Sequence, residues 1–314
     1  MQLKDIDEKI IKEVKKSGLT LESIAITPFE TLMQKLNITK EEAKNLLYSA
    51  QESIGISPKT ATEFLELENR RGFISTSSNE LDSILGGGVY TQEITELVGA
   101  FSSGKTQISF QLCINVQQPK EEGGLSGKAF FIDTERTFSP KRIAEMASER
   151  ELDTATVLDN ILVVYSMSTD HLAIIINQLE DIIKKENVKL IVIDSFASHF
   201  RSEYIGKDKL IDRQQKIMSL AEKLVALSVK FDVAVVVTNQ IIAAVDQFLY
   251  GGVEEPALGY AWAHRPQQRI FLRKSRGTAR IARLFDSSRM PEREALFYVT
   301  SSGIGDSSMP TDFY

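Results

Sequence analysis

The fold is decided by one stretch, Gly99-Ala100-Phe101-Ser102-Ser103-Gly104-Lys105-Thr106, which fits the phosphate-binding pattern G-x-x-x-x-G-K-[ST]. An apolar, strand-like run (residues 94–98) precedes it, and an apolar, helix-like run (108–116) follows it. Glycines let the backbone wrap around an anion, and N–H groups at the helix start face the phosphates. Lys105 supplies positive charge, and we expect the Thr106 hydroxyl to ligate Mg²⁺. The context predicts a nucleotide site that uses every residue from Gly99 to Thr106.

Composition limits the class of protein. The chain has 314 residues, of which 42% are hydrophobic, enough for about two domains with a sizeable core. Its net charge of −6 argues against a generally basic nucleic-acid binder, so any such contact must come from local patches. The single cysteine, Cys113, lies in an apolar run and excludes intrachain disulfides and Cys-based metal sites. With no signal peptide and no apolar run long enough for a bilayer, we expect a cytoplasmic protein without a membrane partner.

The first part of the chain has a helical pattern. Ile6, Ile10 and Val14 recur at helical spacing, and Thr39 followed by two acids reads as the cap of a helix over 43–53. We therefore expect a small all-helical domain over residues 1–56. Residues 56–60 interrupt the pattern, which predicts a linker over 57–72 that contains one short helix at 61–70.

From Phe73 onward strands and helices alternate, which predicts an α/β domain over residues 73–314. Five apolar runs read as strands buried on both faces: Ile94–Val98, Ala129–Ile132, Ile161–Tyr165, Leu190–Ile193 and Val233–Val237. Such runs favour a mainly parallel sheet flanked by helices. Three later segments alternate in polarity and predict antiparallel strands at one edge: Arg269–Arg273, Arg280–Phe285 and Ala295–Thr300.

Polar side chains follow three of the predicted parallel strands. Asp194 ends an apolar strand, where a carboxylate can hold the Mg²⁺ of a nucleotide. Glu135 follows another strand and is the best candidate for activating the water that attacks ATP, although a surface-loop acid is the alternative. Gln240 closes a third strand, where an amide could sense the γ-phosphate and pass its presence to the following loop.

Several blocks in one order resemble the RadA/RecA-type recombinases of archaea and eukaryotes, the ATP-dependent DNA strand-exchange proteins. Besides the phosphate loop with Gln107, the matching blocks are IST (74–76), LDSILGGG (81–88), IDTE (132–135), FRSEY (200–204), DRQQ (212–215), TNQ (238–240) and RKSRG (273–277). The likeness covers residues 57–314 closely and the helical domain more loosely. It implies a RecA-like P-loop ATPase core with a helix-hairpin-helix-like domain before it.

The resemblance also implies roles for single residues. Lys105 and Thr106 would hold phosphates and Mg²⁺, Glu135 would activate water, and Asp194 would order the metal. Gln240 would couple the γ-phosphate to DNA. Arg142 matches the arginine that stacks on adenine, which suits a planar guanidinium. Asp286 falls where a neighbouring subunit caps the nucleotide.

In such proteins two loops contact single- and double-stranded DNA. The first would span residues 201–213, with contributions from Arg201, Tyr204, Lys207 and Arg213; the second would span residues 241–259, with Gln247 and Phe248. Cations against phosphates give sequence-independent, salt-sensitive binding. Without the resemblance, either loop reads as solvated surface. The helical domain lacks glycine at the positions that match the family's duplex-binding hairpins, residues 5–7 and 36–39, so its DNA binding is in doubt.

The chain departs from the family in several places. Filaments or rings form when a Phe-x-x-Ala motif of the linker inserts into a neighbour, and here Pro58 replaces the phenylalanine while Ala61 remains. Loss of that aromatic anchor predicts weaker self-association, unless another linker residue such as Ile56 substitutes. Arg136 stands where the family commonly has a small or polar residue, Ser102 where it often has glycine, and Tyr260 where it has a polar His or Asn.

The sequence is compatible with three functions. The first is a DNA-dependent ATPase that pairs and exchanges DNA strands in recombinational repair. The second is a recombinase-paralog mediator, which binds ATP and DNA or other recombinase or mediator proteins but exchanges strands poorly. The third is a signalling ATPase without a nucleic-acid role. A cationic run argues against the third: Arg265, Arg269, Arg273, Lys274, Arg276, Arg280 and Arg283.

Overall fold

The computed structural model describes residues 6–54, 58–206, 208–242 and 255–307, and the chain divides into two compact units, residues 1–69 and 70–314. The division falls inside the stretch that the sequence predicts as a linker. Within the described residues, no helix combines the length and apolar character needed to cross a membrane.

The first unit is helical. It contains α1 (Glu8–Ser17), α2 (Leu21–Ile26), α3 (Phe29–Leu36), α4 (Lys40–Ile54) and α5 (Ala61–Asn69). Val14, Ile24 and Leu32 are fully buried in its small core. The Asp7 carboxylate accepts a 2.7 Å hydrogen bond from the Lys9 N–H and so caps α1. Asn37 takes the left-handed conformation (φ 50°) that ends α3, a position often given to glycine.

The second unit contains a nine-stranded sheet in the order β13-β12-β11-β10-β3-β7-β6-β4-β5. Its strands are β3 (Ile94–Gly99), β4 (Lys128–Asp133), β5 (Ile161–Tyr165), β6 (Val188–Asp194), β7 (Ala234–Asn239), β10 (Gln268–Lys274), β11 (Ala279–Ser287), β12 (Arg293–Thr300) and β13 (Gly303–Gly305). All neighbours from β10 to β5 are parallel, and β10 to β13 pair in antiparallel fashion.

The predicted fold class is confirmed, with one refinement at the edge. The segment predicted as the first antiparallel strand, β10, is parallel to β3 and antiparallel only to β11. It therefore belongs to the central sheet as well as to the edge. Its Arg269 lies beside Glu96 of β3, which places this basic residue in the middle of the sheet.

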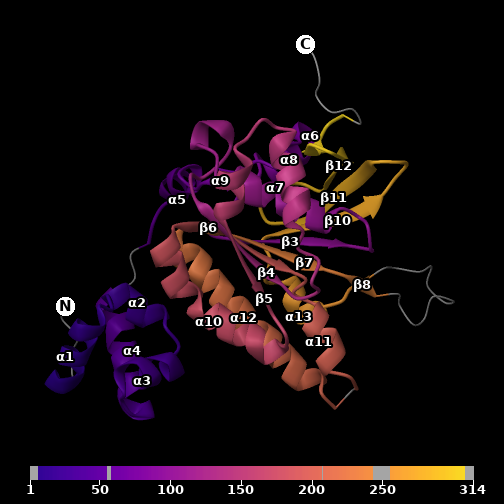
Figure 1. Cartoon of the computed structure of the whole chain (residues 1–314). Coiled ribbons are helices and arrows are strands. Elements are labelled where there is room, and N and C mark those ends of the chain that lie inside the picture. The colour runs from indigo at the N-terminus through magenta and orange to yellow at the C-terminus, as the bar shows by residue number, and fades with distance from the viewer. Residues whose placement is uncertain (1–5, 55–57, 207, 243–254, 308–314) are drawn as a thin grey trace. The chain divides into compact units, whose positions relative to one another are not determined.

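Helices cover both faces of the sheet because its strands are apolar on both sides. One core packs α6 (Asn79–Leu85), α7 (Lys105–Asn115), α8 (Pro140–Ser148) and α9 (Thr154–Asp159) against the sheet. The opposite core packs α10 (Thr169–Glu186), α11 (Ser198–Glu203), α12 (Leu210–Phe231) and α13 (Tyr260–Ala263). Figure 1 shows α10 and α12 side by side on one face and α7 and α8 on the other.

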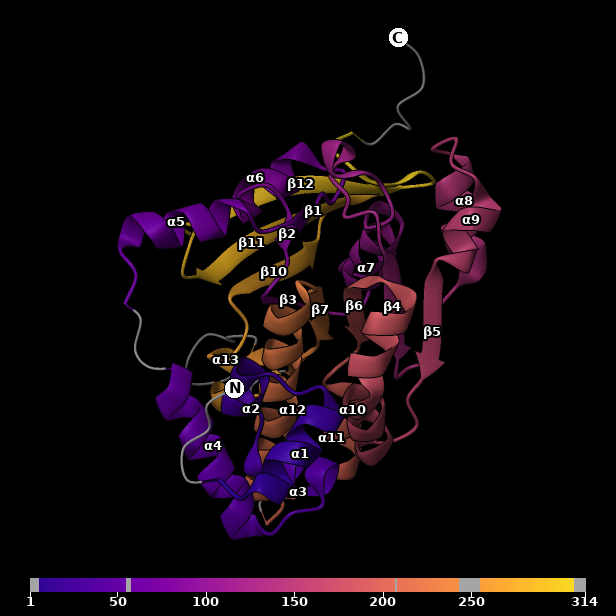
Figure 2. The ribbon, with the colours of Figure 1, turned by 90° about the vertical axis from the view of Figure 1, so that its left-hand side faces the viewer.

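Short elements complete the second unit. β1 (Phe73–Ile74) pairs with β2 (Val89–Tyr90), and β8 (Ile241–Ile242) pairs with β9 (Glu255–Pro256); a 3-10 turn covers Lys120–Glu122. Figure 2 shows the strands β4, β5, β6 and β7 running beside one another. Cys113 of α7 is buried, and its burial raises the pKa of the thiol, so it is a packing residue as the sequence indicates.

Candidate nucleotide-binding site

The phosphate loop joins the end of β3 to the start of α7, at the carboxyl edge of the sheet. A Cβ at Gly99 would come within 2.3 Å of the Leu272 carbonyl oxygen, so only glycine fits there. Gly104 has φ +108°, which suits glycine. Ser102 also has a positive φ of 61°, although it carries a side chain. The departure noted in the sequence thus falls on a left-handed backbone position.

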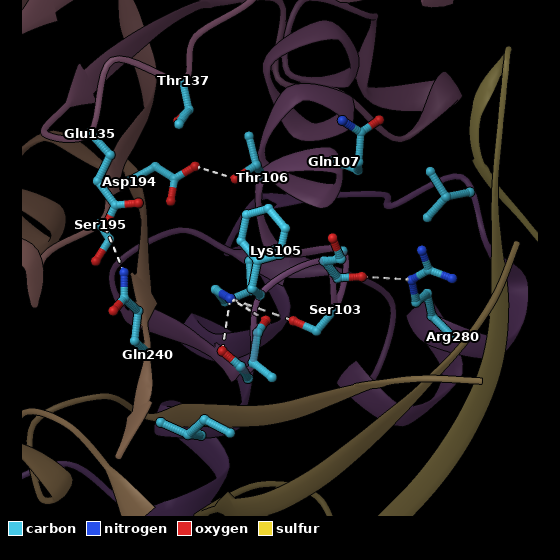
Figure 3. Close-up of a pocket in the computed structure, with 17 residues that line it drawn as sticks. Ser103, Lys105, Thr106, Gln107, Glu135, Thr137, Asp194, Ser195, Gln240 and Arg280 are labelled. Carbon is cyan, nitrogen blue, oxygen red and sulfur yellow. Dashed lines mark hydrogen bonds between the residues drawn. The ribbon is translucent and has the colours of Figure 1, made fainter. Parts of the chain in front are cut away.

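Lys105 lies within the loop. Its Nζ donates hydrogen bonds to the carbonyl oxygens of Gly99 (2.8 Å) and Ala100 (2.9 Å), both in the same loop. Burial lowers the pKa of Lys105, while the carboxylates of Asp194 and Glu135 act in the opposite direction. The ammonium group is held on the concave side of the loop, where phosphate oxygens would gather (Figure 3).

Asp194, at the end of β6, lies against the start of α7. Its Oδ2 accepts a 2.6 Å hydrogen bond from Thr106 Oγ1, and its Oδ1 accepts one from Thr238 Oγ1 of β7. Asp194 is only 4% exposed, and this burial raises the pKa of its carboxyl group. The two residues predicted to bind the metal, Thr106 and Asp194, are therefore in direct contact.

Glu135 is positioned by a second acid that the sequence reasoning did not assign. Asp133, at the end of β4, is fully buried and accepts hydrogen bonds from the backbone N–H groups of Glu135 (2.9 Å) and Phe138 (2.9 Å). These contacts fix the loop that carries Glu135 beside Asp194. Burial, followed by the charge of Asp194, raises the pKa of Glu135. A raised pKa suits a group that accepts a proton.

Gln240 joins the nucleotide site to the first predicted DNA loop. Its Nε2 donates a 2.7 Å hydrogen bond to Glu135 Oε1, and its Oε1 accepts one from Arg201 Nη1. The side chains of Gln240 and Glu135 face each other in Figure 3. A continuous polar chain thus runs from Glu135 to Arg201 of α11.

The loop residues, Glu135, Asp194 and Gln240 line one cavity of about 630 Å³. Mg²⁺ prefers oxygen ligands and uses one or two protein groups together with phosphates and water. Thr106 and Asp194 offer such oxygens, and the buried Ser195 Oγ in the wall has no hydrogen-bond partner. The described residues contain no cluster of three metal-ligating side chains. These donors fit a nucleotide-bound Mg²⁺ better than a protein-only metal site.

Two predicted nucleotide ligands lie outside the cavity wall. Arg142 donates to Gln107 Oε1 through Nε (2.9 Å) and to Glu145 through Nη1 (2.6 Å), and also binds two backbone carbonyl groups. Gln107 does line the cavity. Asp286 of β11 lies 3.7 Å from Arg269 and has a half-exposed side chain. Its role as a cap for a neighbour's nucleotide stays a prediction.

The predicted DNA-binding residues are placed only in part. Arg213 of α12 donates a 2.6 Å hydrogen bond to the Ala257 carbonyl oxygen, which ties the first loop to the second. Tyr204 is half-buried against Phe200, with ring centroids 6.0 Å apart. Lys207, Gln247 and Phe248 lie outside the described residues.

Arg280 is a cavity residue that motif reasoning missed. It comes from β11, donates a 3.1 Å hydrogen bond to the Ser102 carbonyl oxygen, and lies on the side of the loop away from Glu135 (Figure 3). The sequence grouped it only with the cationic run. Four members of that run form ion pairs with carboxylates: Arg265, Arg269, Arg273 and Arg283. The run is therefore less cationic than it reads in the sequence.

Comparison with known proteins gives two findings. The model of the Rad51 family matches residues 70–307. A protein described as "DNA repair and recombination protein RadA" from Metallosphaera sedula is 43% identical over 309 residues, which cover 97% of this chain and 94% of the relative. The similarity extends across both structural units.

Proposed function

Since the chain belongs to the Rad51 family of RecA-like recombinases, we propose that it is an ATP-dependent recombinase that pairs and exchanges DNA strands in recombinational repair. One observation carries the proposal: Lys105, Glu135 and Asp194 share a cavity with Gln240, which is hydrogen-bonded onward to Arg201. This arrangement joins a hydrolytic site to a candidate DNA contact. The protein would act on chromosomal DNA in the cytoplasm.

The reaction at the cavity is hydrolysis of ATP to ADP and phosphate. Glu135 accepts a proton from the attacking water, whose oxygen forms the new bond to the γ-phosphorus as the bond to the β,γ-bridging oxygen breaks. Lys105 and the N–H groups of the loop balance the phosphate charge. Thr106 and Asp194 would hold the Mg²⁺ of the nucleotide, which would supply Lewis-acid stabilisation of the phosphate oxygens.

DNA binding would use cations at the base of the two loops. Arg201 and Arg213 lie on neighbouring helices, and each is already bound to a residue at or near the second loop. Contacts between arginines and phosphates give binding that is steeply salt-dependent and nearly blind to sequence. A strand-exchange protein needs this property because base pairing, rather than the protein, then reads the sequence.

A mediator role is the second candidate, and Pro58 favours it. Pro58 is exposed and lies just before α5, at the position where the resemblance leads us to expect the aromatic anchor for self-association. A protein that assembles poorly with itself could still bind ATP, DNA and another recombinase. Strand exchange separates the two candidates, because only the recombinase carries it out.

The proposal is tested by titrating labelled single-stranded oligonucleotides of two unrelated sequences, with and without ATP, over a range of salt concentrations. We expect ATP to tighten binding, salt to weaken it steeply, and sequence to have little effect. Arg201→Ala should weaken binding in every sequence. Arg265→Ala is the matched control because Arg265 is already ion-paired with Glu222. Equal affinity at low and high salt would rule out the recombinase and a mediator that binds DNA.

A further inference from the structure

A buried carboxylate outside the cavity lies at the centre of a polar cluster. Glu96, in the middle of β3, is fully buried. Its Oε1 accepts hydrogen bonds from Asn239 Nδ2 (2.7 Å) and Trp262 Nε1 (2.6 Å), and its Oε2 accepts one from Arg269 Nε (2.6 Å). Charge-assisted hydrogen bonds of this length are strong, and a low dielectric strengthens them further. The cluster therefore holds three segments firmly to the strand that leads into the phosphate loop.

Two of these donors flank the second predicted DNA loop. Asn239 is the last residue of β7 and directly precedes Gln240, while Trp262 lies in α13, just after the loop returns. The ends of the loop are also joined by the β8–β9 pair and by the Ala257 N–H, which donates to the Gln240 carbonyl oxygen (2.8 Å). Asn239, next to Gln240, and Trp262 of α13 donate to the same oxygen of Glu96. A shift of Gln240 at the cavity must therefore act on α13 through Glu96.

Trp262 is also linked to the metal-binding strand. It is fully buried, and its ring stacks on Phe196 with centroids 4.8 Å apart. Phe196 follows Asp194 by two residues, and its N–H donates to the Thr238 carbonyl oxygen (3.1 Å). Trp262 of α13 thus contacts both Glu96 of β3 and Phe196, which lies just after β6.

We propose that Glu96 is the positioning residue that transmits nucleotide binding to the second DNA loop, through Asn239 on one flank and Trp262 on the other. The inference rests on the proposed function, since it assigns the route by which ATP tightens DNA binding. Glu96 lines no part of the cavity and acts only through its partners. Glu96 should therefore change the coupling between nucleotide binding and DNA binding. This coupling is reciprocal, because each ligand changes the affinity of the other by the same factor.

Three variants test this role. Glu96→Gln keeps the side-chain shape but replaces one acceptor oxygen by an amide donor. Trp262→Phe removes the indole N–H together with some ring volume, and keeps an aromatic ring beside Phe196. Glu93→Gln is the matched control, because Glu93 is also buried, lies just before the same strand, and is ion-paired with Arg71 (3.0 Å) and Arg289 (3.3 Å).

The first measurement is the ratio of DNA affinity with ATP to DNA affinity without it. Coupled sites show ratios of about 5 to 150. We expect Glu96→Gln and Trp262→Phe to reduce the ratio to below about two while ATP affinity without DNA changes by less than about threefold, and Glu93→Gln to keep the parent ratio. A parent ratio in both cluster variants, or an equal loss in Glu93→Gln, would overturn the inference. Melting curves establish that each variant is folded.

The second measurement uses the fact that the chain has a single tryptophan, so its fluorescence reports on Trp262 alone. We expect ATP, without DNA, to change the emission of the parent and of Glu93→Gln but not of Glu96→Gln. If ATP binds and the parent emission stays constant, the route through Trp262 is wrong even where the recombinase function stands. If ATP has no effect on DNA binding by the parent, the ATP-dependent DNA function itself fails together with the inference.

Discussion

Gln240 Nε2 donates a 2.7 Å hydrogen bond to Glu135 Oε1, which links the candidate sensor of the γ-phosphate to the candidate base. Gln240 follows β7 and Glu135 follows β4, two strands that are separated in the sheet by β6. Their contact therefore forms across the end of β6, the strand that ends with Asp194. Because Arg201 binds the same amide, any ligand that competes for Gln240 should alter both the candidate hydrolytic site and a predicted DNA-binding residue.

The first prediction separates binding from hydrolysis. Lys105→Ala should weaken ATP binding at least about tenfold, because the phosphates lose their buried counter-charge. Glu135→Gln should bind ATP normally but hydrolyse it about 10²- to 10⁴-fold more slowly, because only proton abstraction is lost. Equilibrium binding and single-turnover hydrolysis measure the two effects. Lys128→Ala is the control, since Lys128 pairs with Glu186 at the other end of β4. Parental hydrolysis by Glu135→Gln would show that Glu135 is not the base.

The second prediction concerns pH. Burial raises the pKa of Asp194 above its ordinary value of 3.8, so the folded protein holds this proton more tightly than the unfolded chain does. The contribution of this bound proton to folding stability is present below the ordinary pKa of Asp194 and is lost as the pH rises through its raised pKa in the folded protein. Asp194→Asn does not titrate, so in Mg²⁺-free buffer its stability relative to the parent should rise as the pH increases from about 4 to neutral.

Thermal or urea unfolding of both proteins at several pH values checks this prediction. The same variant should bind ATP with Mg²⁺ more weakly, since the metal loses a ligand. A stability difference that does not change with pH, or that shrinks as the pH rises, would contradict the assigned direction.

The third prediction concerns the phosphate loop. Ser102 has φ 61°, a conformation that costs a non-glycine residue about 1–2 kcal/mol. A glycine would avoid this cost, but part of the gain is lost because glycine gives up more conformational entropy on folding. Ser102→Gly should therefore stabilise the protein by up to about 1 kcal/mol, whereas Ser102→Ala should give no gain because its Cβ remains. Melting temperatures without nucleotide measure both. An equal gain from alanine would mean that the hydroxyl, rather than the backbone, is responsible.

The fourth prediction concerns assembly. Pro58 cannot fill an aromatic pocket, so we expect shorter assemblies than those of relatives with phenylalanine there, and Pro58→Phe should strengthen self-association. Each 1.4 kcal/mol of recovered contact raises the association constant about tenfold. Sedimentation at matched concentrations compares the parent with Pro58→Phe and with Pro58→Ala, which removes the proline without adding a ring. If phenylalanine associates no better than alanine, the linker is not the anchor.

The main features of the fold could be predicted from the sequence because buried parallel strands are continuous apolar runs. The β5 bounds, Ile161–Tyr165, match the prediction, and the other strands differ by a few residues at their ends. The edge of the sheet was harder to predict, because polar and apolar residues alternate in β10 as in an antiparallel strand, whereas β10 is parallel to β3. Its Arg269 is buried only because Glu96 pairs with it, and a single sequence shows no such pairing.

The candidate site, like the fold, could be predicted from the sequence in part. The cavity brings together Lys105, Thr106, Glu135, Asp194 and Gln240, which motifs and strand ends pointed to. Neither Arg280 nor Ser195 was predicted to line the cavity, because their places depend on the packing of β11 and on the turn after β6 rather than on a motif. The cationic run misled for the opposite reason: carboxylates from other segments neutralise four of its members.

The most direct test of the recombinase function is a strand-exchange assay between a single strand and a homologous duplex, with the parent protein, with Lys105→Ala, and without ATP. We predict that the parent forms exchanged product only with ATP and that Lys105→Ala forms none. If the parent binds ATP and single-stranded DNA but yields no product on homologous duplex, it is not a strand-exchange recombinase.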